Sequence, residues 1–348
     1  MSKLKLAVIG PGLIGKKHIE LILKHPHCEL TAIVGPQTDE NSEIARRSNV
    51  VLYEDLSSML GVVSIDGAII SSPNIFHVQQ ASECIAKNIP VLVEKPIAHT
   101  YEDGLALMSL VEKHKAKLLV GHHRTYSPII RVAQKIIQEG RLGRIVAFMG
   151  SALFYKPDQY FLDGPWRTQL GGGPILINLI HEIGNMRALC GEISSVQAMT
   201  SNKIRHYVVE DTAAINLRFE SGALGTFLLS DTSSSARSWE QTAGENPAYP
   251  RYEDEDCYTV SGTSGSLAIP SMRLKYYGRD DEKSWWQPFL QEQIAYQRSD
   301  PLQEQLNHFI NVIEGAEVPR VTVFDGLQNL KIVEAISKSA ETGKVISV

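Results

Sequence analysis

The first strand and turn of the chain constrain its fold most strongly. The apolar run Leu4–Ile9 leads directly into the glycine pattern GPGLIG at 10–15, and a helix-like segment follows. In such a strand-turn-helix unit the first glycine makes the tight turn, the second lets a pyrophosphate approach the backbone, and the third lets helix pack on strand. The helix N-terminus also attracts the anion. We therefore predict dinucleotide binding, with a purely structural turn as the alternative. The predicted cofactor contacts here are Gly10, Gly12, Leu13, Ile14 and Gly15.

The same alternation of elements continues to about Gly121. Short β-rich runs alternate with helical segments, a pattern typical of βαβ units and a parallel sheet. The predicted strands are Leu4–Ile9, Leu30–Val34, Gly67–Ile70, Val91–Glu94 and Lys117–Val120. The predicted helices are Gly15–Lys24, Asn41–Arg47, His77–Ala86 and Tyr101–His114. Residues 1–123 are thus predicted to form a doubly wound α/β domain.

After Gly121 the pattern changes to longer, alternating strands, joined in places by hairpin-length connections such as Glu220–Gly222. This pattern favours an antiparallel or mixed sheet, so 124–348 is predicted to be an α+β domain for substrate binding and oligomerisation, with C-terminal helices that can pack back on the first domain. The predicted strands are Ile145–Tyr155, Val196–Ser201, Thr212–Phe219, Ala223–Ser230, Asp256–Ser261, Ser266–Ile269 and Arg273–Tyr277. The predicted helices are Ile129–Glu139, Leu302–Glu314 and Gly326–Thr342. The long segment Thr232–Asp256 is interpreted as a lid or a subunit contact.

Composition limits the partners. A chain of 348 residues suggests about two domains, and a net charge of -5 provides no attraction for nucleic acid or an anionic membrane. The four cysteines are scattered without a CxxC pair, which indicates neither a metal site nor a disulfide framework. No apolar run approaches the roughly 20 residues of a membrane span, and the N-terminus lacks the apolar stretch of a signal peptide. We therefore expect a cytoplasmic protein with a small-molecule partner.

The end of the second predicted strand bears on the choice of cofactor. A carboxylate about 20 residues after the glycines would bind the ribose of NAD. The strand instead runs into Gly35-Pro36-Gln37-Thr38, which contains neither that acid nor a cation for a 2′-phosphate. Gly35 is predicted to lie at the cofactor, and NAD and NADP both remain open.

The tripeptide Glu94-Lys95-Pro96 follows the fourth predicted strand. Ligands bind at the carboxyl ends of parallel strands, and a following proline keeps Lys95 in extended geometry. Lys95 is therefore predicted to project over the cofactor. The alternative is a solvated lysine in a turn.

Taken together, the motifs resemble those of the Gfo/Idh/MocA oxidoreductases, named for glucose-fructose oxidoreductase and inositol dehydrogenase. The motifs that carry the resemblance are GPGLIG, SSPNIFH (71–77), EKP (94–96), GHHRTYSP (121–128), GRLG (140–143), GGG…H (171–181) and GTSGSL (262–267). The resemblance implies a Rossmann domain, a second domain with a large open sheet that often mediates homodimers or homotetramers, and hydride transfer between a nicotinamide cofactor and a substrate hydroxyl or carbonyl. It implies no metal.

The resemblance also assigns roles to residues. Lys95 matches the lysine that contacts the reacting oxygen, and His181 matches the histidine often assigned as general acid/base, a role that suits imidazole near neutral pH. The implied cofactor-side residues are Ser72, Pro73, Asn74, His77 and Glu94. For Asn74, capping of a helix is an equally good interpretation.

Two positions near His181 depart from the family pattern. The usual aspartate four residues before the histidine is Ile177 here, and another frequent acid, three residues after it, is Gly184. Asn178 lies close enough on a helix to share the face of His181 and to bond a substrate hydroxyl. Capping of the helix start is the alternative for Asn178.

Two further segments are expected to edge the substrate pocket by the same resemblance. They supply Arg124 and Tyr126 after the fifth strand, and Trp166 and Arg167 before the glycines. The two arginines either clamp a carboxylate or phosphate, or pair with acids of the chain. Trp239 and Arg237 of the long segment are further candidates to close over the pocket.

The predicted function is an NAD(P)-dependent oxidoreductase acting on a secondary hydroxyl of a sugar, cyclitol or related hydroxy acid. Lys95 would polarise the reacting oxygen, His181 would transfer its proton, and Asn178 would orient this polyhydroxy substrate. Two alternatives remain: a non-catalytic dinucleotide-binding regulator, and a dehydrogenase of a non-sugar dihydrodiol.

Overall fold

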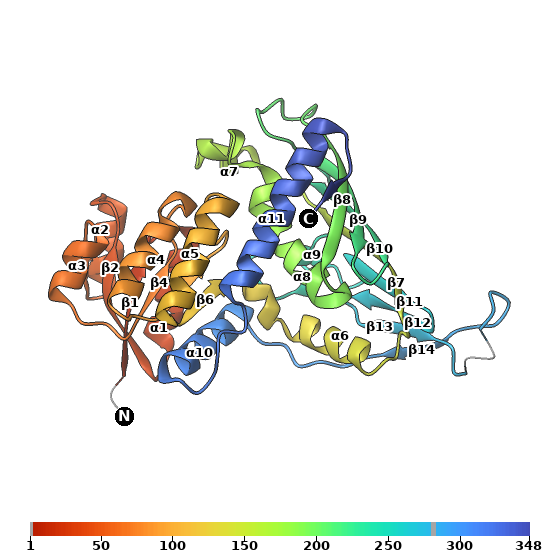
Figure 1. Cartoon of the computed structure of the whole chain (residues 1–348), viewed down its shortest axis with the longest axis horizontal. Helices are drawn as coiled ribbons and strands as arrows, with labels where there is room; N and C mark the ends of the chain where they lie inside the picture. The colour runs from red at the N-terminus through yellow and green to blue at the C-terminus, as the bar shows by residue number, and fades with distance from the viewer. Residues whose placement is uncertain (1–2, 280–282) are drawn as a thin grey trace. The chain divides into compact units, whose positions relative to one another are not determined.

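The computed structural model describes residues 3–279 and 283–348. The chain divides into two compact units, shown in Figure 1. The first comprises the chain up to His123 together with Leu302–Leu330, and the second comprises Arg124–Pro301 together with Lys331–Val348. Each unit is built around its own sheet, and α11 (Val323–Thr342) contributes to both units.

The first unit contains a six-stranded parallel sheet in the order β3-β2-β1-β4-β5-β6. This order is that of the doubly wound dinucleotide-binding fold, which confirms the predicted class. The strands are β1 (Leu4–Ile9), β2 (Cys28–Val34), β3 (Val51–Tyr53), β4 (Gly67–Ile70), β5 (Val91–Glu94) and β6 (Leu118–Gly121). The helices are α1 (Leu13–Lys24), α2 (Asp39–Arg47), α3 (Leu56–Val62), α4 (His77–Ala86), α5 (Tyr101–His114) and α10 (Pro301–Glu314).

The second unit contains a nine-stranded sheet in the order β14-β13-β12-β11-β7-β10-β9-β8-β15. Among the strand pairs of the described residues, only β7–β10 is parallel, so the predicted mostly antiparallel sheet is confirmed. The strands are β7 (Ile145–Leu153), β8 (Ile193–Ser201), β9 (Thr212–Phe219), β10 (Leu224–Ser230), β11 (Tyr258–Gly262), β12 (Gly265–Ile269), β13 (Arg273–Tyr276), β14 (Leu290–Gln293) and β15 (Ile346–Ser347).

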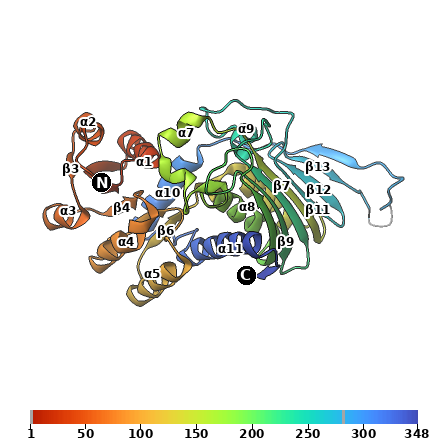
Figure 2. The same ribbon diagram turned by 90° about the horizontal axis from the view of Figure 1, so that it is seen from above.

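The core of the second unit lies on one face of this sheet. Buried side chains of the strands pack there with α6 (Pro128–Gln138), α8 (Ile180–Cys190) and the later part of α11. Figure 2 shows α8 and α11 along this face of the sheet. Along β9 the burial alternates residue by residue, as expected for a strand with one covered face. The opposite face leaves large apolar side chains exposed, among them Met149, Met199, Leu224 and Leu228.

Several elements differ from the sequence predictions. β3 and α3 were not predicted, because the VLY strand is short and none of its residues is fully buried. The segment after the glycines begins with a π-helical turn, Ile175–Leu179, before α8. The segment Thr232–Asp256 contains α9 (Trp239–Ala243), whose Trp239 is 3% exposed in the core. The proposal that Trp239 closes over a pocket mouth is therefore wrong.

Candidate functional site

Each glycine of the turn after β1 lies in a different steric environment. Gly10 has a φ of +88°, and a Cβ there would overlap the backbone of Ser72. A Cβ on Gly15 would overlap the carbonyl of Gly10, so α1 packs against the turn only because this side chain is absent. Gly12 caps α1 without a side-chain bond, and a Cβ there would meet nothing within 4 Å. The turn therefore leaves the N-terminal amides of α1 open to an anion.

The end of β2 also lies beside this turn. A Cβ on Gly35 would stand 2.7 Å from Cδ of Pro11, so these two loops approach closely. The first acids after the strand are Asp39 and Glu40 in α2, and Glu40 pairs with Lys16 of α1. Gly35–Thr38 carries neither an acid nor a cation.

The loop after β4 is tied to both neighbouring turns. Ser71 donates from Oγ to the Gly10 carbonyl over 2.8 Å. His77 lies with its ring nitrogens 2.8 Å from two carbonyl oxygens, those of Ser72 and Pro96. Burial lowers the pKa of His77, against the opposing effect of the hydrogen bonds to these two carbonyls. His77 thus connects the loop after β4 to the turn after β5.

Pro73 and Asn74 occupy the exposed part of this loop. Pro73 precedes a short 3-10 helix, Asn74–Phe76, and Asn74 is its first residue. Neither this helix nor α4 has a side-chain cap. The capping interpretation of Asn74 is therefore wrong.

The turn that carries Lys95 is held from below by a buried pair. Glu94 is 3% exposed, and its Oε1 lies 2.8 Å from Nε2 of His18 in α1. Its Oε2 accepts the backbone N–H of Lys95 over 3.2 Å. Burial opposes ionisation of Glu94, but the hydrogen bond and charge of His18 outweigh it and the pKa of Glu94 is lowered. Glu94 therefore positions Lys95 at the carboxyl end of β5.

In the second unit, the three glycines bring the chain close to two other groups. Gly171 and Gly173 have φ angles of +89° and +79°. A Cβ on Gly172 would lie 2.6 Å from the carbonyl oxygen of Arg167, and one on Gly173 would lie 2.7 Å from Oε1 of Glu210. The same Glu210 oxygen accepts the N–H of Ile175 over 2.8 Å. The glycines therefore fix the start of the π-turn.

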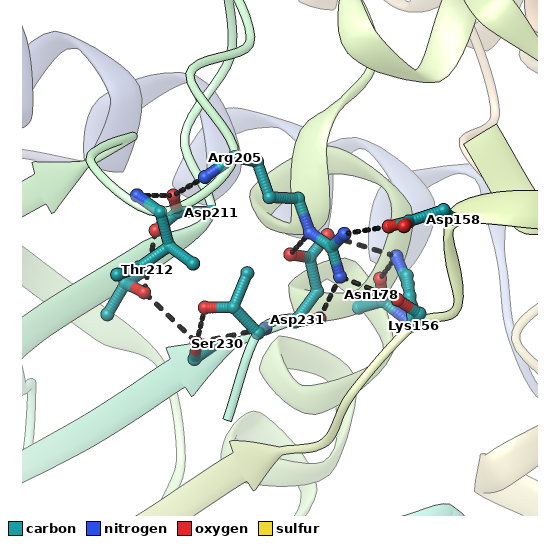
Figure 3. A network of polar contacts seen from close by, with 10 residues as sticks. Lys156, Asp158, Asn178, Arg205, Asp211, Thr212, Ser230 and Asp231 are labelled. Carbon is teal, nitrogen blue, oxygen red and sulfur yellow. Dashed lines mark hydrogen bonds and ion pairs between the residues drawn. The ribbon is translucent and has the colours of Figure 1, made fainter. Parts of the chain in front are cut away.

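Asn178 lies inside this π-turn, and its amide has an unexpected partner. Lys156, which follows β7, donates from Nζ to Oδ1 of Asn178 over 2.7 Å (Figure 3). The N-cap of α8 is Leu179, without a side-chain bond, so the capping interpretation of Asn178 is wrong. His181 follows in the first turn of α8 and is 9% exposed. Sequence reasoning missed Lys156, because nothing in its local pattern links it to a segment 22 residues later.

Lys156 belongs to a larger polar network, shown in Figure 3. Arg205 donates from Nε to Asp231 over 2.9 Å, and from Nη2 to the carbonyl oxygens of Lys156 and Asp231 over 2.6 Å each. The Lys156 ammonium lies 3.8 Å from Asp231. Burial raises the pKa of Asp231, against the opposing charges of Lys156 and Arg205. The network fixes the backbone of Lys156 through Arg205.

Arg124 lies in a buried acid cluster. It is 4% exposed and donates from Nη1 to Glu182 over 2.5 Å and from Nη2 to Glu240. Burial disfavours charge on Arg124, but the carboxylates outweigh it and raise the pKa of the guanidinium. Tyr258 also donates to Glu182. Arg124 therefore pairs with acids of the chain, which was one of its two predicted roles. Tyr126, two residues later, is 1% exposed.

Arg167 lies in a different environment. Its guanidinium stacks over the ring of Tyr160, 3.9 Å from the centroid, and donates to the Tyr160 carbonyl. No carboxylate of residues 3–279 or 283–348 forms an ion pair with it, and within those ranges its buried Nε has no hydrogen-bond partner. Trp166 beside it is 56% exposed.

The described part of the chain contains no group of three or more His, Cys, Asp or Glu side chains arranged to hold a metal ion. None of its helices is both long and apolar enough to cross a membrane. A cavity of about 320 Å³ is lined by Pro128, Ile129, Gly244, Glu245, Pro247, Tyr296, Arg298, Ser299 and Asp300, none of which belongs to the predicted site.

Comparison with known proteins connects both units to one family. Residues 4–122 match the model for the oxidoreductase family with the NAD-binding Rossmann fold, and residues 130–268 match the GFO/IDH/MocA C-terminal domain. The chain is 25% identical to the rhizopine catabolism protein MocA of Rhizobium meliloti, covering 97% of this chain and 95% of that protein. It is 24% identical to the scyllo-inositol 2-dehydrogenase (NAD(+)) of Bacillus subtilis strain 168, covering 99% and 96%.

The fold is also that of solved structures. The WlbA dehydrogenase of Bordetella pertussis, solved with NADH and UDP-GlcNAcA, has a TM-score of 0.80 at 23% identity, covering 99% of each chain. The chain belongs to the Gfo/Idh/MocA family of NAD(P)-binding oxidoreductases.

Proposed function

We propose that this protein oxidises a secondary hydroxyl, or reduces the corresponding carbonyl, of a sugar, cyclitol or related hydroxy acid. The observation that carries the proposal is the linked set of turns at the carboxyl ends of β1, β4 and β5. Ser71 and His77 join these turns, and Glu94 with His18 holds the one that presents Lys95. Ligands of open α/β sheets bind at this edge.

The residues of this edge fit a dinucleotide. The open space at Gly12 and the uncapped start of α1 suit a pyrophosphate, and Leu13 and Ile14 lie in the first turn of that helix. Gly35, Ser72, Pro73 and Asn74 are proposed to line the rest of the cofactor site. The nicotinamide, when bound, exchanges the hydride. Either NAD or NADP fits Gly35–Thr38, which has neither an acid nor a cation.

Side chains of the protein are proposed to polarise the reacting oxygen and to transfer its proton. Lys95 donates to that oxygen and stabilises negative charge on it. His181 accepts the hydroxyl proton during oxidation and returns it during reduction. Asn178, Trp166 and Arg167 orient the substrate. We reassign Arg124, Tyr126, His77 and Glu94 to positioning roles, because their polar groups are buried against other parts of the chain.

The experiment that tests this function is the Lys95→Ala variant. Turnover of a panel of cyclitols, aldoses, aldonates and dihydrodiols should fall by about 10²–10⁴-fold, while NADH or NADPH binding, followed by fluorescence, persists. Lys87→Ala, an exposed lysine at the end of α4, is the control. Undiminished turnover in Lys95→Ala would reject the assignment. Cofactor binding without turnover of any compound by the unaltered protein would favour the non-catalytic regulator.

We also propose that the protein is a cytoplasmic homodimer or homotetramer that binds neither nucleic acid nor membranes. The support for self-association is the uncovered face of the nine-stranded sheet, where Met149, Met199, Leu224 and Leu228 are between 44% and 73% exposed. Exposed apolar patches of this kind are typical of interfaces. A monomeric mass by light scattering would contradict the proposal.

A further inference from the structure

The orientation of the Asn178 amide follows from the chemistry of its neighbour. An ammonium group donates hydrogen bonds and cannot accept them. Because Lys156 Nζ lies 2.7 Å from the amide, the group facing it must be the oxygen. The Nδ2 amine of Asn178 therefore faces away from Lys156, and within the described residues it donates to no protein group. Toward a ligand, Asn178 is a donor.

Lys156 is held firmly enough to fix that orientation. Its side chain is 11% exposed and lies over the rings of Tyr160 and Phe154, 4.7 and 5.6 Å from their centroids. Its backbone carbonyl accepts from Arg205 over 2.6 Å. A flip of the Asn178 amide would place two donors against each other, so Lys156 excludes it.

A second cation shares the same aromatic ring. Arg167 stacks on Tyr160 and donates from Nη1 to the Tyr160 carbonyl. Within the described part of the chain its Nη2 makes no hydrogen bond, so this nitrogen retains its donors for a ligand. Guanidinium groups pair well with carboxylates, because their donors match the two oxygens.

The acids nearby are largely committed to other groups. Asp231 bonds Arg205 at 2.9 Å and lies 3.8 Å from Lys156. Asp211 accepts the backbone N–H groups of Ile204 and Arg205. Glu210 accepts the N–H of Ile175, and its pKa is raised by burial. The Asp158 side chain is 82% exposed and lies 3.4 Å from Arg205.

We propose that Asn178, Lys156 and Arg167 form a donor cluster that selects substrates carrying a carboxylate close to the reacting carbinol. Arg167 and the amine of Asn178 bind the carboxylate oxygens, and Lys156 fixes the amide and adds positive charge. This inference rests on the proposed oxidoreductase function and narrows its substrate to sugar acids. Asn178 is a specificity residue, and Lys156 is a positioning residue that acts through it.

The test uses matched pairs that differ only in the acid group, namely D-gluconate against D-glucitol and D-glucuronate against D-glucose. Binding is measured by thermal shift and calorimetry with NADH or NAD present, and kcat/KM is measured for each compound. The unaltered protein should favour the acid of at least one pair by about 10–100-fold, the range expected for hydrogen bonds to a charged group.

Variants assign that preference to the cluster. Lys156→Met and Arg167→Met should each lower acid binding by about tenfold while changing the neutral partner little. Asn178→Asp, which replaces the donor by an acceptor of the same shape, should also lower it. Lys156→Arg should restore much of the preference, because a donor again faces the amide oxygen. Lys203→Met, an exposed cation removed elsewhere in the unit, is the control, and circular dichroism verifies folding.

The outcomes separate this inference from the proposed function. Turnover without any acid preference, or a preference unchanged in Lys156→Met and Arg167→Met, would overturn the donor cluster and leave the oxidoreductase assignment intact. Acid-selective binding that the variants abolish, without turnover of any compound, would support the cluster and reject the proposed chemistry. If neither acid bound better than its neutral partner, the cluster would be rejected.

Discussion

Arg124 and Arg167 lie in the same unit and were predicted to share one role, yet they occupy opposite environments. Arg124 is buried between two carboxylates, Glu182 and Glu240. Arg167 is stacked on an aromatic ring and has no ion pair with any carboxylate in the described part of the chain. A buried cation paired with acids is committed to the fold, and its removal alone leaves an uncompensated charge, whereas a cation stacked on a ring retains donors for a ligand.

The acid cluster around Arg124 also has a consequence for the site. Glu182 follows His181 directly in the first turn of α8, and Tyr258 of β11 donates to it. Arg124 therefore anchors the turn that presents His181. The Arg167 region anchors nothing comparable, since Arg167 contacts Tyr160, Trp166 and the glycine segment. The first region supports the geometry of the site, and we propose that the second contacts the ligand.

The largest expected effect is a difference in the free energy of unfolding between variants of the two arginines. Arg124→Leu leaves Glu182 buried without its cation, removes the partner of the half-buried Glu240, and should lower the free energy of unfolding by about 3–5 kcal/mol. Arg167→Leu removes a cation-ring contact and should cost about 1 kcal/mol. Urea unfolding followed by circular dichroism measures both.

A matched double variant sharpens this result. Arg124→Leu combined with Glu182→Leu should recover part of the loss, because one uncompensated acid is removed together with its partner. Equal losses from the two arginine variants would break the comparison and place Arg167 among the stabilising groups.

A smaller effect is expected at the glycines before the π-turn. Alanine at Gly171 or Gly173 must adopt a positive φ, which costs about 1–2 kcal/mol. At Gly173 the new Cβ would also lie 2.7 Å from Glu210, which holds the N–H of Ile175, whereas at Gly171 it would meet nothing within 4 Å. Gly173→Ala should therefore lose more thermal stability and more acid selectivity than Gly171→Ala. Equal effects would show that Glu210 does not hold the π-turn.

The smallest effect is a pH dependence in the first unit. The pKa of Glu94 is below its ordinary value of 4.5 in the folded state, so the folded state binds its proton less readily than the unfolded state. Its stabilising contribution is complete above about pH 4.5 and is lost as the pH falls through the folded pKa. Glu94→Gln should flatten the acid limb of the melting temperature against pH. Glu112→Gln, an exposed glutamate of α5, is the control and should leave that limb unchanged.

Glu182 provides the opposite sign within the Arg124 region. Burial raises the pKa of Glu182 against the opposing charge of Arg124, so the folded state holds this proton more tightly than the unfolded state does. The ionised Glu182 therefore destabilises the fold, and this contribution is relieved as the pH falls toward the ordinary carboxyl pKa.

The outcome that would contradict the buried pair of Glu94 and His18 is an acid limb that becomes steeper in Glu94→Gln.

Sequence patterns predicted local elements well where the pattern and the burial agree. Four strand predictions, at Leu4–Ile9, Gly67–Ile70, Val91–Glu94 and Thr212–Phe219, have the observed bounds, because each is a run of β-forming residues bounded by turn residues. The helices His77–Ala86 and Tyr101–His114 also have the predicted bounds. β3 and the π-turn escaped prediction. A three-residue strand carries too little pattern, and a π-turn shares its apolar spacing with an ordinary helix.

The amino-acid sequence alone determined the fold class, the family and the places of Lys95 and His181 in their motifs. These features depend on glycine turns and strand ends, whose residues are neighbours in the sequence. Only the tertiary structure decided which polar groups are already satisfied. It paired Arg124 with two acids, left Arg167 on a ring, and brought Lys156 to the amide of Asn178. These partners lie between 7 and 116 residues apart in the sequence, and hydrogen bonding between such groups depends on how the strands and helices pack.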